Sequence, residues 1–145
     1  MSYSPKFRTS LLRSARLLSD HLNDLLTAHE LNYSLWLVIY TLHERGVLTS
    51  IELAKLLNVS KPSIAKRTST LQQLGLIEHH SSEDKREKNL FLSDKGRALF
   101  EICTAKIDQY EAELLAHISA ADLSTCSDVL NRILLQLNPE AGVKA

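Results

Sequence analysis

Residues 48–76, LTSIELAKLLNVSKPSIAKRTSTLQQLGL, decide the fold. Thr49 and Glu52 have the spacing of a capping box, which predicts a short helix that stops near Asn58. A good N-cap serine and a first-turn proline follow, and they predict a second helix from Lys61 to Gly75. Two short helices joined by a tight turn form a helix-turn-helix.

The second helix has two unlike faces on a wheel of ~100° per residue. Ile64 and Leu71 gather on one side with Thr68, whereas Lys66 stands among small polar residues on the other. Such a face fits a DNA major groove, and N-terminal serines suit phosphate. A solvated helix face with a few basic residues is the alternative. The candidate DNA contacts here are Thr49, Ser60, Lys61, Pro62, Ser63, Lys66, Arg67, Ser69 and Thr70.

The periodicity changes after Gly75. Residues 76–80 and 89–92 are short strand candidates, and the segment between them has no apolar side chain. This pattern predicts a hairpin with a charged tip. A hairpin directly after a helix-turn-helix makes a winged helix, so we expect a mainly α fold of the α+β winged-helix type.

Further helices flank this core. Residues 6–29 carry an apolar stripe at spacings of three and four, and residues 34–45 are apolar nearly all round, which indicates burial. Gly46 is expected to end the second of these helices. After the hairpin, Ser93 and Asp94 are expected to cap a long helix. A last helix is expected over residues 121–137.

Composition fits a globular protein. The chain has 145 residues, of which 44% are hydrophobic and 23% charged, and its formal net charge is zero. The longest apolar run, Leu35–Tyr40, is far shorter than the ~20 residues that cross a bilayer, and two cysteines make no disulfide framework. We expect a cytoplasmic protein without a membrane partner. Residues 53–77 hold four basic residues and no acidic one, which favours local anion binding.

The ordered series of motifs resembles the MarR family of winged-helix transcription regulators. The residues that carry the resemblance lie at 36–39, 48–54, 59–64, 71, 75–77, 83–86 and 92–96. The resemblance implies an obligate homodimer, with residues 1–30 and 101–145 in dimerisation helices and 31–100 in a DNA-binding domain. It also implies that residues 61–75 are the recognition helix of a transcriptional repressor that reads a pseudo-palindromic operator.

The resemblance assigns roles in the hairpin tip. Arg86 matches the arginine that enters the minor groove, Asp84 would hold it, and Lys85 and Lys88 would flank it on phosphate. The sequence departs from the family at Ala65-Lys66, where Thr-Arg is usual, at Thr68 and Thr70, and at His79-His80. Fewer permanent charges therefore face DNA, which predicts weaker backbone binding or a different half-site.

Other chemistry has weaker support. A small aromatic or anionic effector is possible in a cleft lined by Tyr33, Trp36 and Tyr40 with Arg13 or Arg16 as counter-charge, although a core role for Trp36 is the simpler interpretation. The scattered histidines predict no metal site, and no cofactor is expected. Cys103 and Cys126 occupy apolar helix positions typical of small core residues. No enzyme motif is present, so the alternatives are a redox- or metal-responsive regulator, or a winged-helix dimer that acts through protein partners.

Overall fold

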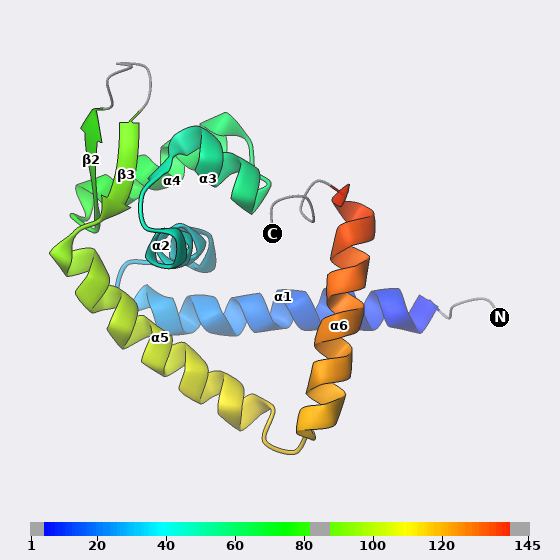
Figure 1. The fold of residues 1–145 in the computed structure, drawn as a ribbon. Coiled ribbons are helices and arrows are strands. Elements are labelled where there is room, and N and C mark those ends of the chain that lie inside the picture. The colour runs from blue at the N-terminus through cyan, green and yellow to red at the C-terminus, as the bar shows by residue number, and fades with distance from the viewer. Residues whose placement is uncertain (1–4, 82–87, 140–145) are drawn as a thin grey trace. The chain divides into compact units, whose positions relative to one another are not determined.

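The computed structural model describes residues 5–81 and 88–139, which form mainly helices and one small sheet (Figure 1). The chain divides into two compact units, Met1–Ile107 and Asp108–Ala145, and the boundary falls within α5. The elements are α1 (Pro5–Thr27), α2 (Tyr33–Arg45), β1 (Leu48–Thr49), α3 (Ser50–Leu57), α4 (Lys61–Gln73), β2 (Ile77–Ser81), β3 (Lys88–Leu92), α5 (Asp94–Leu114) and α6 (Ala120–Leu137).

The three strands form one antiparallel sheet in the order β1-β3-β2. The predicted hairpin is confirmed, with Ile77 opposite Leu92 and His79 opposite Leu90. The sequence did not predict β1, which pairs Leu48 with Leu90. A two-residue strand has no periodicity of its own, so only its partner β3 defines it.

The core of the first unit surrounds α2. Val38 and Ile39 are fully buried there, as the all-round apolar pattern predicted, and Gly46 ends the helix with a φ of 87°. The prediction did not include Phe100 of α5, whose ring stacks on Trp36 at a centroid distance of 5.3 Å. The other core residues include Leu26, Leu31, Leu35, Leu42, Leu48, Leu53, Ile64, Leu71, Leu76, Ile77, Leu90, Leu92 and Cys103.

The predicted helix ends of the helix-turn-helix are largely confirmed. The capping box of α3 is complete, because the Glu52 N–H donates to Thr49 Oγ1 and the Thr49 N–H donates to Glu52 Oε1. Asn58 ends α3 in the left-handed region with a φ of 54°. The prediction for the end of α4 was two residues too long, since the helix stops at Gln73 and Gly75 turns the chain with a φ of 75°.

Two hydrogen bonds of the Ser93 hydroxyl connect the turn after α4 to the start of α5. Ser93 Oγ donates to the Gly75 carbonyl at 2.6 Å and accepts from the Gly96 N–H at 3.0 Å. A Cβ on Gly96 would lie 2.0 Å from the carbonyl oxygen of Leu76. Glycine at position 96 is therefore what allows α5 to start against this turn.

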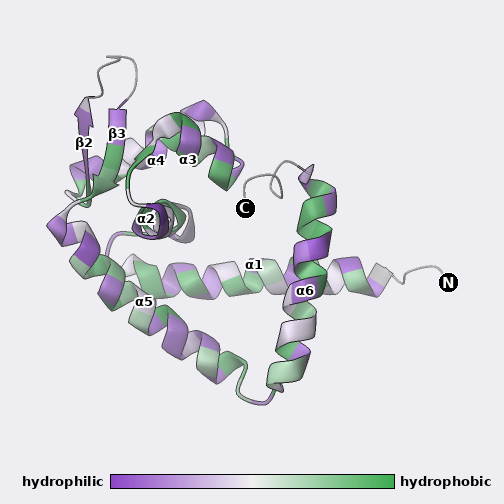
Figure 2. Cartoon of the chain, viewed as in Figure 1, coloured by the Kyte–Doolittle hydropathy of each residue, from purple (hydrophilic) through white to green (hydrophobic). Residues whose placement is uncertain are grey.

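In the second unit, the cap of α6 is Ser119, whose Oγ accepts from the Asp122 N–H at 3.1 Å. No residue of α6 is buried within the single chain, and Figure 2 shows strongly hydrophobic segments along it. Cys126 is exposed, so the prediction that it is a core residue is wrong for the single chain, whereas Cys103 is buried as predicted. None of the helices described here is long and apolar enough to cross a membrane.

Candidate nucleic-acid interface

The two faces of α4 are those that the wheel predicted. Ile64 and Leu71 are 1% and 0% exposed and Thr68 is buried with them. Lys66 and Ser69 are exposed on the other side, together with Lys61, Pro62 and Gln73. Because the buried side packs on the core, α4 has a fixed orientation and presents this polar, basic surface outward.

The N-terminus of α4 is capped by the protein itself. Ser60 Oγ accepts from the Ser63 N–H at 3.2 Å, and Pro62 has no N–H. Fewer backbone N–H groups are therefore open to a phosphate beside the expected serine contacts, because the Ser63 N–H is already bonded. Any anion at this end would rely on Lys61 and on side-chain hydroxyls.

Three other candidate contacts are engaged within the chain. Arg67 Nη1 donates to the carbonyl oxygen of Ser34 at 3.4 Å, which links α4 to the first turn of α2. Thr70 Oγ1 donates to the Lys66 carbonyl at 3.0 Å. The Thr49 hydroxyl belongs to the capping box of α3. These bonds give the three side chains a role in the protein whatever they touch outside it.

The hairpin places its two histidines on opposite faces, as strand alternation predicts. Gln72 Nε2 lies 2.8 Å from His79 Nδ1, whereas the His80 ring lies 5.2 Å from the ring of Phe91. The contact between Gln72 and His79 was missed, because nothing local in the sequence marks it. Lys88 is exposed at the start of β3. The other candidates of the hairpin tip, Asp84, Lys85 and Arg86, lie outside the described residues.

The residues expected to line an effector cleft differ in exposure. Trp36 is 5% exposed and belongs to the core, in agreement with the simpler interpretation. Tyr40 is 46% exposed, and Tyr33 is half-buried. Arg13 and Arg16 are exposed on α1. Of the residues expected to line the cleft, Trp36 is therefore enclosed by the core, whereas the others keep part of their surface accessible.

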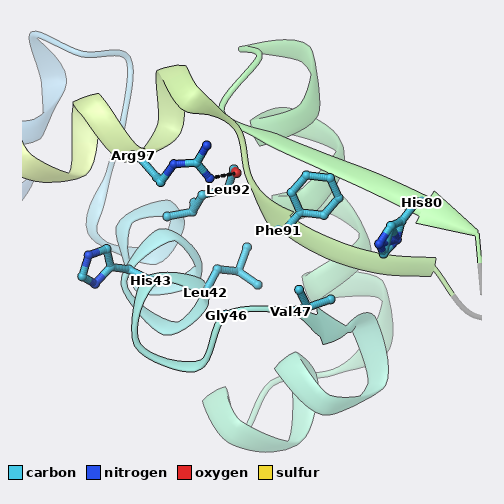
Figure 3. Close-up of a pocket in the computed structure, with 8 residues that line it drawn as sticks. All are labelled: Leu42, His43, Gly46, Val47, His80, Phe91, Leu92 and Arg97. Atoms are coloured by element: carbon cyan, nitrogen blue, oxygen red, sulfur yellow. Dashed lines mark hydrogen bonds between the residues drawn. The ribbon is translucent and has the colours of Figure 1, made fainter.

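An open cavity of about 500 Å³ lies elsewhere, between the end of α2, the sheet and the start of α5 (Figure 3). Arg97 donates to the carbonyl of Leu92 at 2.8 Å and pairs with Asp94, so its charge is already matched. The cavity is lined by Leu42, His43, Gly46, Val47, His80, Phe91, Leu92 and Arg97.

Burial makes Cys103 a poor nucleophile. Burial raises the pKa of its thiol, and the ammonium of Lys106 opposes that shift. Lys106 Nζ lies 3.2 Å from His29 Nε2 on the turn after α1. Across residues 5–81 and 88–139, no group of three or more histidine, cysteine or acidic side chains is arranged to hold a metal ion.

Known proteins resemble this chain along most of its length. The sequence model of the MarR family matches residues 31–88. An uncharacterized HTH-type transcriptional regulator of Bacillus subtilis (strain 168), YwoH, is 32% identical over 86% of this chain and 90% of its own. A MarR of Staphylococcus aureus solved with salicylate and kanamycin is 28% identical, with a TM-score of 0.86 over 94% of this chain and 93% of its own. A mutant MarR of E. coli complexed with operator DNA shares the fold at 23% identity, with a TM-score of 0.80 over 90% of this chain and 94% of its own.

Proposed function

The chain belongs to the MarR family of transcriptional regulators, and on that premise we propose that it is a homodimeric repressor of a pseudo-palindromic operator. The observation that carries the proposal is the exposed, polar and basic face of α4 beside a hairpin. A helix of this kind fits the major groove, and a neighbouring hairpin fits the adjacent minor groove. Lys66 and Arg86 are the proposed base-reading residues, one in each groove.

The remaining candidate contacts are proposed to bind the DNA backbone. Lys61 and Lys88 are exposed at the start of α4 and of β3, where a phosphate can approach each ammonium group. The other proposed backbone contacts are Thr49, Ser60, Pro62, Ser63, Arg67, Ser69 and Thr70, with Lys85 beside Arg86 and with Asp84 orienting that arginine. These contacts set register and carry little sequence information.

The dimer is proposed to form through α1 and the C-terminal helices, in residues 1–30 and 101–145, with residues 31–100 as the DNA-binding domain. Leu12 on α1 is 63% exposed and Leu134 on α6 is 53% exposed in the single chain. Apolar side chains spread along two helices are costly to leave in water, and a second copy is the partner that the family premise supports.

A small aromatic acid is the proposed effector class. The support is that a relative from Staphylococcus aureus was solved with salicylate. In this chain Tyr33 and Tyr40 offer aromatic surface, and Arg13 offers a positive charge. Salicylate titrated into the protein–operator complex is expected to release DNA from the wild type at lower concentration than from Arg13→Ala. Equal release from both proteins would remove Arg13 from the site.

The function is tested by selecting genomic fragments on the purified protein and titrating the best fragment with salt. We expect a short inverted repeat whose half-sites lie about one helical turn, ~10 bp, apart. The logarithm of affinity should fall steeply with the logarithm of salt concentration, because phosphate contacts release counterions. Failure to enrich any fragment over bulk DNA would favour the competing function, a winged-helix dimer that acts through protein partners.

Two substitutions test whether Lys66 and Arg86 read bases. Lys66→Ala should lower specific affinity more than non-specific affinity, and Arg86→Ala should weaken the preference for A·T pairs beside each half-site. Lys106→Ala is the matched control, because it removes one exposed positive charge from α5. A loss from Lys66→Ala that is uniform across DNA sequences would leave Lys66 as a phosphate contact only.

A further inference from the structure

One hydrogen bond joins α4 directly to the hairpin through two residues that are not among the candidate DNA contacts named above. Gln72 in the last turn of α4 is half-buried, and its Nε2 lies 2.8 Å from Nδ1 of His79 on β2. This contact links the two elements that the proposed function places in neighbouring grooves. The inference below therefore rests on that function.

Strand register explains why His79 makes the contact and His80 does not. His79 lies opposite Leu90, which is 2% exposed, so both side chains point to the core-facing side of the hairpin. His80 lies opposite Asn89 and points to the other side, where it meets Phe91. Of the two histidines, only His79 therefore reaches α4.

The turn between α4 and β2 is anchored separately. Lys95 Nζ donates to the Leu74 carbonyl at 2.8 Å, and the Ser93 N–H donates to the Leu76 carbonyl at 3.0 Å. These bonds fix where the two elements meet. Pairing with β3 and the burial of Ile77 also hold β2 in the sheet. Gln72 and His79 lie on either side of the turn and add a direct link between the side chains of α4 and β2.

The carboxamide of Gln72 can form a hydrogen bond with His79 Nδ1 whether that nitrogen acts as acceptor or as donor. Where Nδ1 of His79 has a free lone pair, the Gln72 amide N–H can donate to it. Where Nδ1 carries the hydrogen, the carboxamide can turn and accept it with its oxygen. The carboxamide of Gln72 therefore matches both forms of His79.

We propose that Gln72 and His79 are a positioning pair, which holds the hairpin at the angle at which α4 and the hairpin tip engage adjacent grooves together. Loss of the pair therefore weakens specific DNA binding through the hairpin, although neither side chain reads a base.

The test is a double-mutant cycle on operator binding with Gln72→Ala, His79→Ala and the double variant. Each single variant is expected to lower operator affinity by roughly threefold to tenfold, the range of one net hydrogen bond, and the double variant should be no weaker than the singles. Non-specific affinity should stay unchanged. Footprinting should show reduced protection at the outer flanks of the operator, where the hairpin tips bind.

Two further variants distinguish a positioning role of the Gln72–His79 pair from a general effect of removing a histidine from the hairpin. His80→Ala removes the same ring from the opposite face and should keep wild-type affinity. His79→Asn keeps an acceptor on Cγ and should recover most of the affinity, and thermal unfolding should shift by no more than about 5 °C in any variant. Additive losses in the cycle, or an equal loss from His80→Ala, would overturn the proposal. A wild-type protein that binds no operator would reject the DNA-binding function itself, and the role of the pair with it.

Discussion

Thr49, Ser60 and Thr70 each engage their hydroxyl group with the protein's own backbone, whereas Lys66 and Ser69 of the same region stand exposed. The difference follows from position. A hydroxyl at a helix N-terminus meets an unpaired N–H, and one within a helix meets the carbonyl four residues earlier. At the residue scale, the strongest candidates for DNA recognition are therefore the side chains that the fold does not already use.

Gly96→Ala is expected to destabilise the protein by roughly 3 kcal/mol, because the added methyl group overlaps backbone that side-chain rotation cannot move. The Cβ position lies 2.0 Å from the Leu76 carbonyl oxygen. Gly46→Ala is the control, since nothing lies within 4 Å of its Cβ position and only its φ of 87° opposes the change. Chemical denaturation measures both, and a smaller loss for Gly96→Ala than for Gly46→Ala would contradict the steric explanation.

Cys103 should add a pH dependence to stability at alkaline pH. Burial raises the pKa of its thiol in the folded state, so this stabilising contribution is complete below the unfolded value of about 8.5 and declines as pH rises from there through the folded pKa. The free energy of unfolding should fall more steeply between about pH 8 and pH 10 in the wild type than in Cys103→Ala. Equal slopes would mean that the thiol ionises as readily in the folded protein.

At the scale of elements, local sequence accounts for where the helices begin and stop. Thr49 with Glu52 and Ser60 with the following proline start α3 and α4 as predicted, and glycine ends α2. Strand alternation likewise places the side chains of His79 and His80 on opposite faces of the hairpin. These features depend on neighbours within a few residues, which is why a single sequence reveals them.

Ser60→Ala should lower the free energy of unfolding by about 1 kcal/mol, because the Ser63 N–H loses its acceptor. Ser69→Ala on the exposed face of the same helix should change it by less than about 0.5 kcal/mol. Urea denaturation of both variants makes the comparison. If the two losses are alike, the cap contributes nothing beyond the general cost of removing a serine hydroxyl.

At the scale of the whole molecule, the single chain leaves much of its apolar sequence uncovered. Every residue of α6 is at least partly exposed, and α1 buries Leu22 and Leu26 near its end while Leu12 and Leu17 stay exposed. Of the apolar stripe predicted along α1, the single chain covers only the last part. We expect an oligomer because the exposed apolar side chains of α1 and α6 are costly to leave in water.

Leu134→Glu is expected to shift the protein from dimer to monomer, because it places a charge in the proposed apolar interface. Light scattering should give twice 16.3 kDa for the wild type and a value close to 16.3 kDa for the variant. Gln136→Glu, on an exposed polar position of the same helix, should remain dimeric. A wild-type protein that is monomeric at every concentration would contradict the dimer.

The sequence by itself determined the helix-turn-helix, the hairpin, the core face of α4 and the exposure of Lys66, because caps, turns and periodicity act over a few residues. Only the tertiary structure decided β1, the burial of Phe100 against Trp36, the need for glycine at position 96 and the bond between Gln72 and His79. The first three depend on segments distant in the chain that meet after folding, and their spacing in the sequence carries no sign of the contact. The bond between Gln72 and His79 spans only seven residues, but it depends on how the turn between α4 and β2 folds back.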